Sequence, residues 1–205
     1  MKSTARLKKA VCFLASIAPL GYLAYLLSRY ASGDPAALGA DPGKAIVLFL
    51  GEWALIMLML TLAVSPLQDL LKYKLVPFRR MLGLFAFTYA ALHATAYSVF
   101  LLGLDFSDIW ADVVERPYIT VGALALIGML PLAVTSTRGM QRRLRHNWKR
   151  LHRLIYLIGF FAVIHFFWQT RSDFTEPLLY SAALALLMGH RVLKSTRNRS
   201  ARQAQ

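Results

Sequence analysis

The chain has 205 residues, of which 57% are hydrophobic, and its 24 Lys and Arg outnumber 10 Asp and Glu to give a formal net charge of +14. Soluble domains are roughly 45–50% apolar, so this composition excludes an ordinary soluble fold. The single cysteine, Cys12, excludes an internal disulfide framework and a cysteine-based metal cluster.

Six apolar segments are long enough, or nearly long enough, to span a bilayer, which requires about 20 residues for a hydrocarbon core of about 30 Å. They are residues 10–28, 45–64, 81–103, 117–136, 151–168 and 177–193. A backbone in lipid satisfies its hydrogen bonds internally, so these segments are expected to be helices. The sequence predicts an all-α integral membrane protein, a six-transmembrane-helix bundle formed by a single domain over residues 1–205.

The first apolar segment follows a basic N-terminus, as a signal peptide does. It is long enough to cross the membrane, and no clear small-residue cleavage site precedes the polar loop. We therefore expect this segment to be retained as the first span.

Basic residues gather on one set of flanks. Of the 24 Lys and Arg, 19 lie in the N-terminus, in 65–80, in 137–150 and in the C-terminal end from Arg191, whereas 4 lie in 29–44, 102–116 and 169–176. The positive-inside rule then predicts both termini, including a basic tail over 194–205, in the cytoplasm. This distribution favours a topology signal and lipid-headgroup contact over nucleic-acid binding. The acidic outer loop 102–116 is the candidate docking surface for a partner.

Three histidines lie in or at the ends of predicted spans. His93 lies within the third span, His152 begins the fifth, and His165 lies near the outer end of the fifth. The third and fifth spans run in the same direction, so His93 and His165 are expected at the same depth in the membrane, which we call the outer level. Arg79, which precedes the third span, shares an inner level with His152. Intramembrane ionisable residues are functional candidates, and a neutral imidazole nitrogen is a good haem-iron ligand. This pattern predicts a haem held between the third and fifth helices.

Helix phase complicates the inner level. The separation of His152 and His165 leaves them about 140° apart on an ideal helix, so a kink or bulge between them would be needed to align them. Taken alone, each histidine can also be a hydrogen-bonded packing residue. His190 is expected to be an interfacial side chain, and His146 a loop residue.

Two other function classes compete with haem binding. A cofactor-free transporter or assembly factor would also have six spans. A membrane metalloenzyme is disfavoured because the histidines never fall at helical ligand spacing and no HExxH motif is present. The chain also lacks GxGxxG and P-loop motifs, so it has no domain that takes hydride from a nicotinamide cofactor.

Five stretches together carry a family resemblance. They are LGADPGK (38–44), RRMLGLFAFTYAALHATAY (79–97), RPYITVG (116–122), TSTRGMQRRLRHNWKRLHRLIYL (135–157) and HFFW (165–168). The chain resembles the ferric reductase and NADPH oxidase transmembrane domain and, more closely, the MsrQ (YedZ) family of haem-binding membrane subunits. The matching stretches are spread along most of the chain.

The resemblance implies a haem b bound within six helices, with His93, His152 and His165 at the positions of the iron ligands. Arg79 stands where the wider family pattern has a fourth histidine. Arginine has no lone pair for iron, so a second, inner haem stays open. Its guanidinium suits a haem propionate or a flavin phosphate instead.

The resemblance also implies an electron-transfer subunit rather than the catalytic reductase itself. Electrons would come from the quinone pool, or from a cytosolic flavin reductase, with FMN as a further cofactor. They would pass to MsrP, a periplasmic molybdopterin enzyme that reduces methionine sulfoxide in oxidised envelope proteins.

Overall fold

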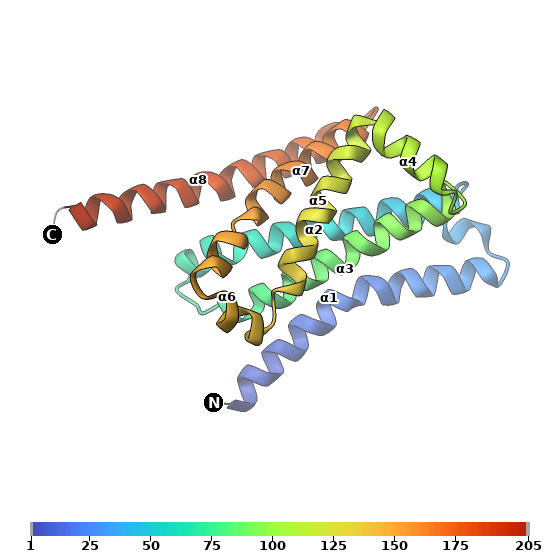
Figure 1. The fold of residues 1–205 in the computed structure, drawn as a ribbon. Helices are drawn as coiled ribbons and strands as arrows, with labels where there is room; N and C mark the ends of the chain where they lie inside the picture. The colour runs from blue at the N-terminus through green and yellow to red at the C-terminus, as the bar shows by residue number, and fades with distance from the viewer. Residues whose placement is uncertain (1, 204–205) are drawn as a thin grey trace. The chain divides into compact units, whose positions relative to one another are not determined.

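The computed structural model describes residues 2–203, which are helical apart from short connections and contain no strand (Figure 1). Residues 204–205 of the predicted basic tail lie outside the described residues. The elements are α1 (Lys2–Ala31), a short 3-10 helix η1 (Pro35–Ala37), α2 (Pro42–Leu71), α3 (Val76–Phe100), α4 (Phe106–Glu115), α5 (Pro117–Val134), α6 (Arg138–Leu151), α7 (Leu154–Gln169) and α8 (Thr175–Gln203).

Four helical segments among the described residues are long and apolar enough to cross a membrane. They are Arg6–Ala31, Pro35–Leu71, Val76–Phe100 and Pro117–Val134. A fifth crossing results if α6 and α7 form one broken span, and α8 does not meet the criterion because His190, Arg191 and Lys194 interrupt its apolar part. The all-helical membrane class is confirmed, whereas the sixth crossing stays a prediction.

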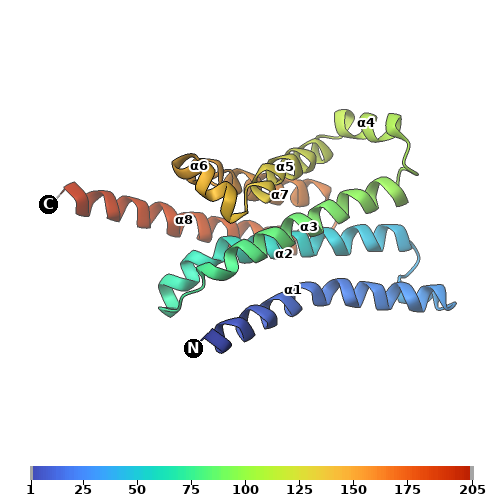
Figure 2. The same cartoon turned by 60° about the horizontal axis from the view of Figure 1, so that its bottom comes forward.

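The basic flank 137–150 forms a helix of its own. Thr137 caps α6 by accepting a hydrogen bond at Oγ1 from the Met140 backbone N–H, at 3.2 Å. The helix is kinked at Arg145, where φ is +46°. It ends at Leu151, α7 starts at Leu154, and the two helices are bent by 50°. Figure 1 shows the change of direction between α6 and α7, and Figure 2 shows the same helices from another side.

Contacts divide the chain into two compact units. Unit 1 comprises Met1–Thr61 and Phe78–Arg116, and unit 2 comprises Leu62–Pro77 and Pro117–Gln205. Unit 1 therefore contains α1, α3, α4 and most of α2, and unit 2 contains α5 to α8 with the end of α2.

Unit 1 is built around the fully buried Tyr89 of α3. Its hydroxyl donates to the Ser16 backbone oxygen of α1 at 2.8 Å, and its ring lies 6.4 Å from that of Trp53 on α2. Tyr97 donates a hydrogen bond to the Asp112 carboxylate, which joins α4 to α3. Polar groups in apolar helices thus find partners on neighbouring helices, as membrane-embedded polar groups require.

Unit 2 packs α7 against α5 and α8 through small residues. A Cβ added to Gly128 of α5 would lie 3.1 Å from Ile158 Cγ1, and one added to Gly159 of α7 would lie 3.2 Å from Leu62 Cδ1. Both glycines let helices approach closely, which is the usual role of small residues in membrane helices. Gly159 therefore has a packing role within this unit.

Candidate functional site

His93 lies midway along α3 and makes a hydrogen bond to the backbone of a neighbouring helix. Its Nδ1 is 2.8 Å from the backbone oxygen of Val47 on α2. A carbonyl oxygen only accepts, so Nδ1 carries the ring proton and Nε2 carries the lone pair of the neutral imidazole. The contact fixes both the tautomer and the orientation of the ring.

This contact depends on a glycine one helical turn further along α2. A Cβ placed at Gly51 would lie 2.9 Å from Nδ1 and from Cε1 of His93. Real Cβ atoms do not approach that closely, so the His93 ring would have to move away from α2 if Gly51 carried a side chain. Glycine is therefore required for the approach.

His165 of α7 repeats the same arrangement in unit 2. Its Nδ1 is 2.6 Å from the backbone oxygen of Tyr118 on α5. A Cβ at Gly122, again one turn after the carbonyl, would lie 2.7 Å from His165 Nδ1. The imidazole of His165 thus has the same tautomer as that of His93 and packs on a glycine in the same way.

Each of these two histidines therefore has a backbone carbonyl for Nδ1 and a glycine beneath the ring. Metal-ligating histidines usually donate their second ring nitrogen to a carbonyl or carboxylate, which orients the ring and raises the basicity of the ligand atom. A histidine that binds a metal through Nε2 needs this tautomer. Among the described residues, no group of three or more His, Cys, Asp or Glu side chains could hold a metal ion.

His152 has a different environment. It lies in the break between α6 and α7 rather than on α7, and its Nε2 is 3.1 Å from Thr135 Oγ1. Thr135 donates its hydroxyl proton to the Pro131 backbone oxygen at 2.6 Å, so Nε2 of His152 is the donor toward Thr135. The ring also stacks on Trp148 with centroids 3.9 Å apart. Because His152 lies before this bend, the phase angle of a single straight helix does not describe its position relative to His165.

Arg79 lies in the first turn of α3, half-buried, on the same continuous helix as His93. The two residues belong to unit 1, whereas His152 and His165 belong to unit 2. Pairing of His93 with His165, and of Arg79 with His152, stays a prediction from the sequence.

The supporting residues were not identified in the sequence, although a signal for them exists. The segments Gly51-Glu-Trp-Ala-Leu-Ile and Gly122-Ala-Leu-Ala-Leu-Ile share four of six letters, and each glycine precedes its histidine by nearly the same distance along the chain. This weak repeat marks the two helices that accept a histidine. The carbonyls of Val47 and Tyr118 leave no such signal, because every residue has one.

The family model described as "Ferric reductase like transmembrane component" matches residues 50–164 of the chain. This range includes His93 and His152 and ends just before His165. No solved structure matches the chain.

Similar proteins cover nearly the whole chain. A protein of Xanthomonas campestris pv. campestris (strain 8004) is 47% identical over 203 residues, and one of Xanthomonas euvesicatoria pv. vesicatoria (strain 85-10) is 46% identical over 199 residues; both matches cover 96% of this chain and 91% of the relative. A protein of Rhodospirillum rubrum is 41% identical over 206 residues, which covers 100% of this chain and 96% of the relative. Each is named "Protein-methionine-sulfoxide reductase heme-binding subunit MsrQ".

Alanine at either supporting glycine is expected to destabilise the fold. Gly122→Ala should lower the free energy of unfolding by about 1–3 kcal/mol, because the new methyl group collides with the His165 ring. Gly51→Ala should act in the same direction through His93. Thermal or denaturant unfolding in detergent would measure both.

Gly21→Ala and Gly189→Ala are the matched controls, because nothing lies within 4 Å of a Cβ at either helical position. These controls should equal or exceed the wild type in stability, since alanine favours a helix over glycine. If Gly122→Ala is as stable as Gly189→Ala, the tight contact between His165 and α5 does not exist.

Proposed function

Because this chain belongs to the MsrQ family of haem-binding subunits of protein-methionine-sulfoxide reductases, within the ferric reductase-like transmembrane proteins, we propose that it is a haem b electron-transfer subunit of the bacterial inner membrane. It takes electrons from the quinone pool, or from a cytosolic flavin reductase. It delivers them to the periplasmic molybdopterin enzyme MsrP, which reduces methionine sulfoxide in oxidised envelope proteins.

One observation carries this proposal: the matched surroundings of His93 and His165. Each ring donates Nδ1–H to a carbonyl of a neighbouring helix and has its lone pair on Nε2. Two such imidazoles are the donor set that a six-coordinate haem iron needs. When bound, haem b supplies a metal centre that gains and loses one electron at a time.

The protein residues hold and tune the two ligand rings. The carbonyls of Val47 and Tyr118 hold the ring proton on Nδ1 and so fix the tautomer and the orientation of each imidazole. Gly51 and Gly122 set the depth to which each ring sinks against its neighbouring helix. A ring held in this way has little freedom to lose on binding, and the fixed ligand geometry limits rearrangement during electron transfer.

His152 and Arg79 have a separate part in the proposal, at the cytoplasmic level. For His152 to bind iron through Nε2, the hydroxyl of Thr135 must first release that nitrogen. The guanidinium of Arg79 is suited to a haem propionate or to the phosphate of FMN. The proposal therefore holds His93 and His165 as the primary ligands and His152 as a ligand of an inner haem.

Haem binding is tested on the purified chain. A dithionite-reduced minus oxidised spectrum should show a stoichiometric b-type haem in the wild type, and His93→Ala and His165→Ala should each lose it or convert it to a high-spin form. His146→Ala is the matched control, because His146 is exposed on α6 and should keep the wild-type spectrum. A full low-spin spectrum in His93→Ala would end the proposed ligation. If the wild-type protein folds and is supplied with haem but contains none, the alternative function of a cofactor-free transporter or assembly factor is favoured.

The proposed protein crosses the membrane six times and has both termini in the cytoplasm. Fusions at the C-terminus test whether α8 is the sixth crossing. A fluorescent-protein fusion at the C-terminus should be fluorescent, and an alkaline-phosphatase fusion there should be inactive. Alkaline phosphatase inserted in 102–116 or 169–176 should be active. An active phosphatase at the C-terminus would show that α8 does not cross, which leaves the five spans that length and composition alone allow.

A further inference from the structure

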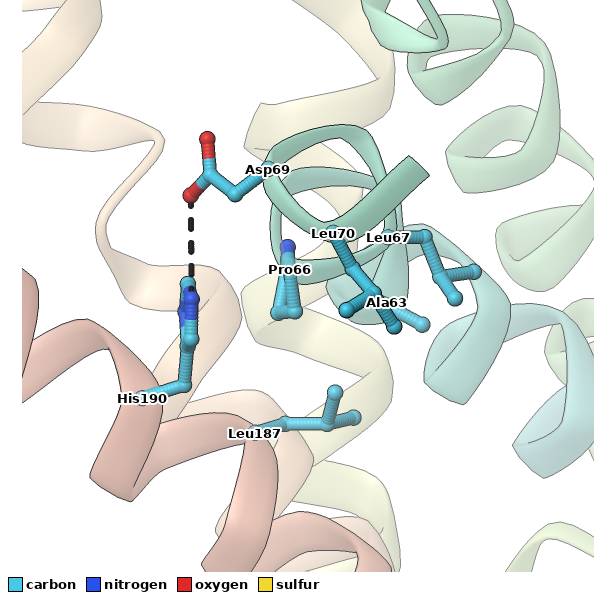
Figure 3. Close-up of a pocket in the computed structure, with 7 residues that line it drawn as sticks. All are labelled: Ala63, Pro66, Leu67, Asp69, Leu70, Leu187 and His190. Atoms are coloured by element: carbon cyan, nitrogen blue, oxygen red, sulfur yellow. Dashed lines mark ion pairs between the residues drawn. The ribbon is translucent and has the colours of Figure 1, made fainter. Parts of the chain in front are cut away.

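An apolar pocket of about 410 Å³ lies between the end of α2 and α8, within unit 2. Its apolar walls come from Ala63, Pro66, Leu67 and Leu70 of α2 and from Leu187 of α8. His190 and Asp69 form its polar edge, with His190 Nε2 3.7 Å from Asp69 Oδ2 (Figure 3). The pocket is thus apolar except at one imidazole–carboxylate pair.

The two walls are held together by the arginine next to His190. Pro66 has no N–H, so the backbone oxygen of Leu62 loses its usual helical partner. Arg191 replaces that partner by donating Nη2 to Leu62 O at 3.3 Å and to Ser65 Oγ at 3.3 Å. Arg191 of α8 thus bonds to α2 at the carbonyl that Pro66 leaves without a helical partner, and Pro66 also lines the pocket.

Arg191 also connects the pocket to the region of His152. Its Nη1 donates to the Tyr156 hydroxyl of α7, and its guanidinium lies 4.7 Å from the centroid of that ring. Tyr156 follows His152 by one helical turn's length of chain. The pocket is therefore at the same end of unit 2 as the histidine that the proposed function places at the cytoplasmic level.

The polar edge of the pocket has unused hydrogen-bonding capacity. His190 Nδ1 is buried and has no hydrogen-bond partner among the described residues, although the side chain as a whole is 38% exposed. A buried nitrogen without a partner costs free energy, which a hydroxyl or carbonyl from a ligand would recover. Asp69 has a further partner in Lys194, whose Nζ lies 2.6 Å from Oδ2.

We propose that this pocket binds the ring of a hydroquinone or quinone, with one ring oxygen hydrogen-bonded to the His190 imidazole. The inference rests on the proposed function and assigns a site to its membrane electron donor. The apolar walls suit a substituted ring and an apolar tail, and the pocket is open rather than enclosed. It lies next to Lys72, which follows α2, and to Lys194 of α8, and basic residues at the ends of apolar helices are typical of the cytoplasmic membrane surface.

The charge at the polar edge separates this ligand from the other lipid-soluble candidates. A phosphate headgroup would place an anion beside the Asp69 carboxylate, which repels it. A hydroquinone hydroxyl and a quinone carbonyl are both neutral, and an imidazole nitrogen can accept from the first or donate to the second, so the imidazole–carboxylate pair accommodates either form. An acyl chain alone would leave the unsatisfied nitrogen of His190 without a partner.

Filling the pocket tests the assignment. Leu187→Trp places a large ring in the pocket, and Leu186→Trp is the matched control, because Leu186 is the next residue of α8, is 75% exposed and does not line the pocket. The probe is decylubiquinone, and its dissociation constant is measured by equilibrium dialysis against the haem-loaded protein in nanodiscs. We expect Leu187→Trp to weaken binding about tenfold or more and Leu186→Trp to bind as the wild type does.

The hydrogen bond is tested separately with His190. His190→Phe should weaken decylubiquinone binding about tenfold, and His190→Gln should restore most of it, because the amide keeps a hydrogen-bonding group at that position. The haem spectrum of each variant must match that of the wild type, which shows that the chain is folded. Retention of wild-type affinity by His190→Phe would contradict the hydrogen bond and overturn the proposal.

The remaining outcomes separate this site from the proposed function. Equal affinities of Leu187→Trp and Leu186→Trp for decylubiquinone would overturn the site. The site would also be overturned if Leu187→Trp lost co-purified phospholipid but bound decylubiquinone as the wild type does. A wild type that carries haem but binds no quinone would overturn this site and leave the haem ligation standing. A wild type without haem would overturn the proposed function, and with it this inference.

Discussion

An imidazole within an apolar helix must find a partner for its N–H, and in this chain that partner is twice a backbone carbonyl. His93 and His165 each reach a carbonyl on the neighbouring helix, and each can do so because a glycine follows that carbonyl by one turn. A carbonyl inside a helix already accepts one hydrogen bond, and its second lone pair is accessible only where no side chain covers it. This requirement sets the rotation of α2 toward α3 and of α5 toward α7.

The sequence predicted the spans that correspond to α1, α2, α3 and α5, because long apolar runs have few alternatives in lipid. It placed the three histidines on or beside the correct helices. It did not predict that 137–150 forms a helix, since a segment with six basic residues lacks the apolar periodicity that indicates one. The break after Leu151 followed from no sequence rule either. At this break His152 contacts Trp148, one turn earlier in the chain, and Thr135, and the second contact is tertiary.

Residue pairs across helices were the least predictable part of the site. The predicted span 45–64 ends before Pro66, whereas α2 continues through this proline, and Arg191 of α8 satisfies the carbonyl that the proline leaves without a partner. Gly159 lies in the predicted span 151–168, and in unit 2 a Cβ at this position would meet Leu62 and Leu184. Both contacts depend on how two helices are rotated relative to each other. The composition and the residue spacing of one helix do not give that rotation. Polar residues and small residues thus have paired roles that a single helix does not reveal.

The central claim is that His93 and His165 bind one iron through their Nε2 atoms. Pulsed electron paramagnetic resonance of the oxidised protein, prepared with isotopically labelled histidine, counts the histidine nitrogens that couple directly to the iron. We expect two coordinated histidines at this iron in the wild type, and either one or loss of this haem in each of His93→Ala and His165→Ala. Two coordinated histidines in either variant, or an iron bound by neither residue, would contradict this claim.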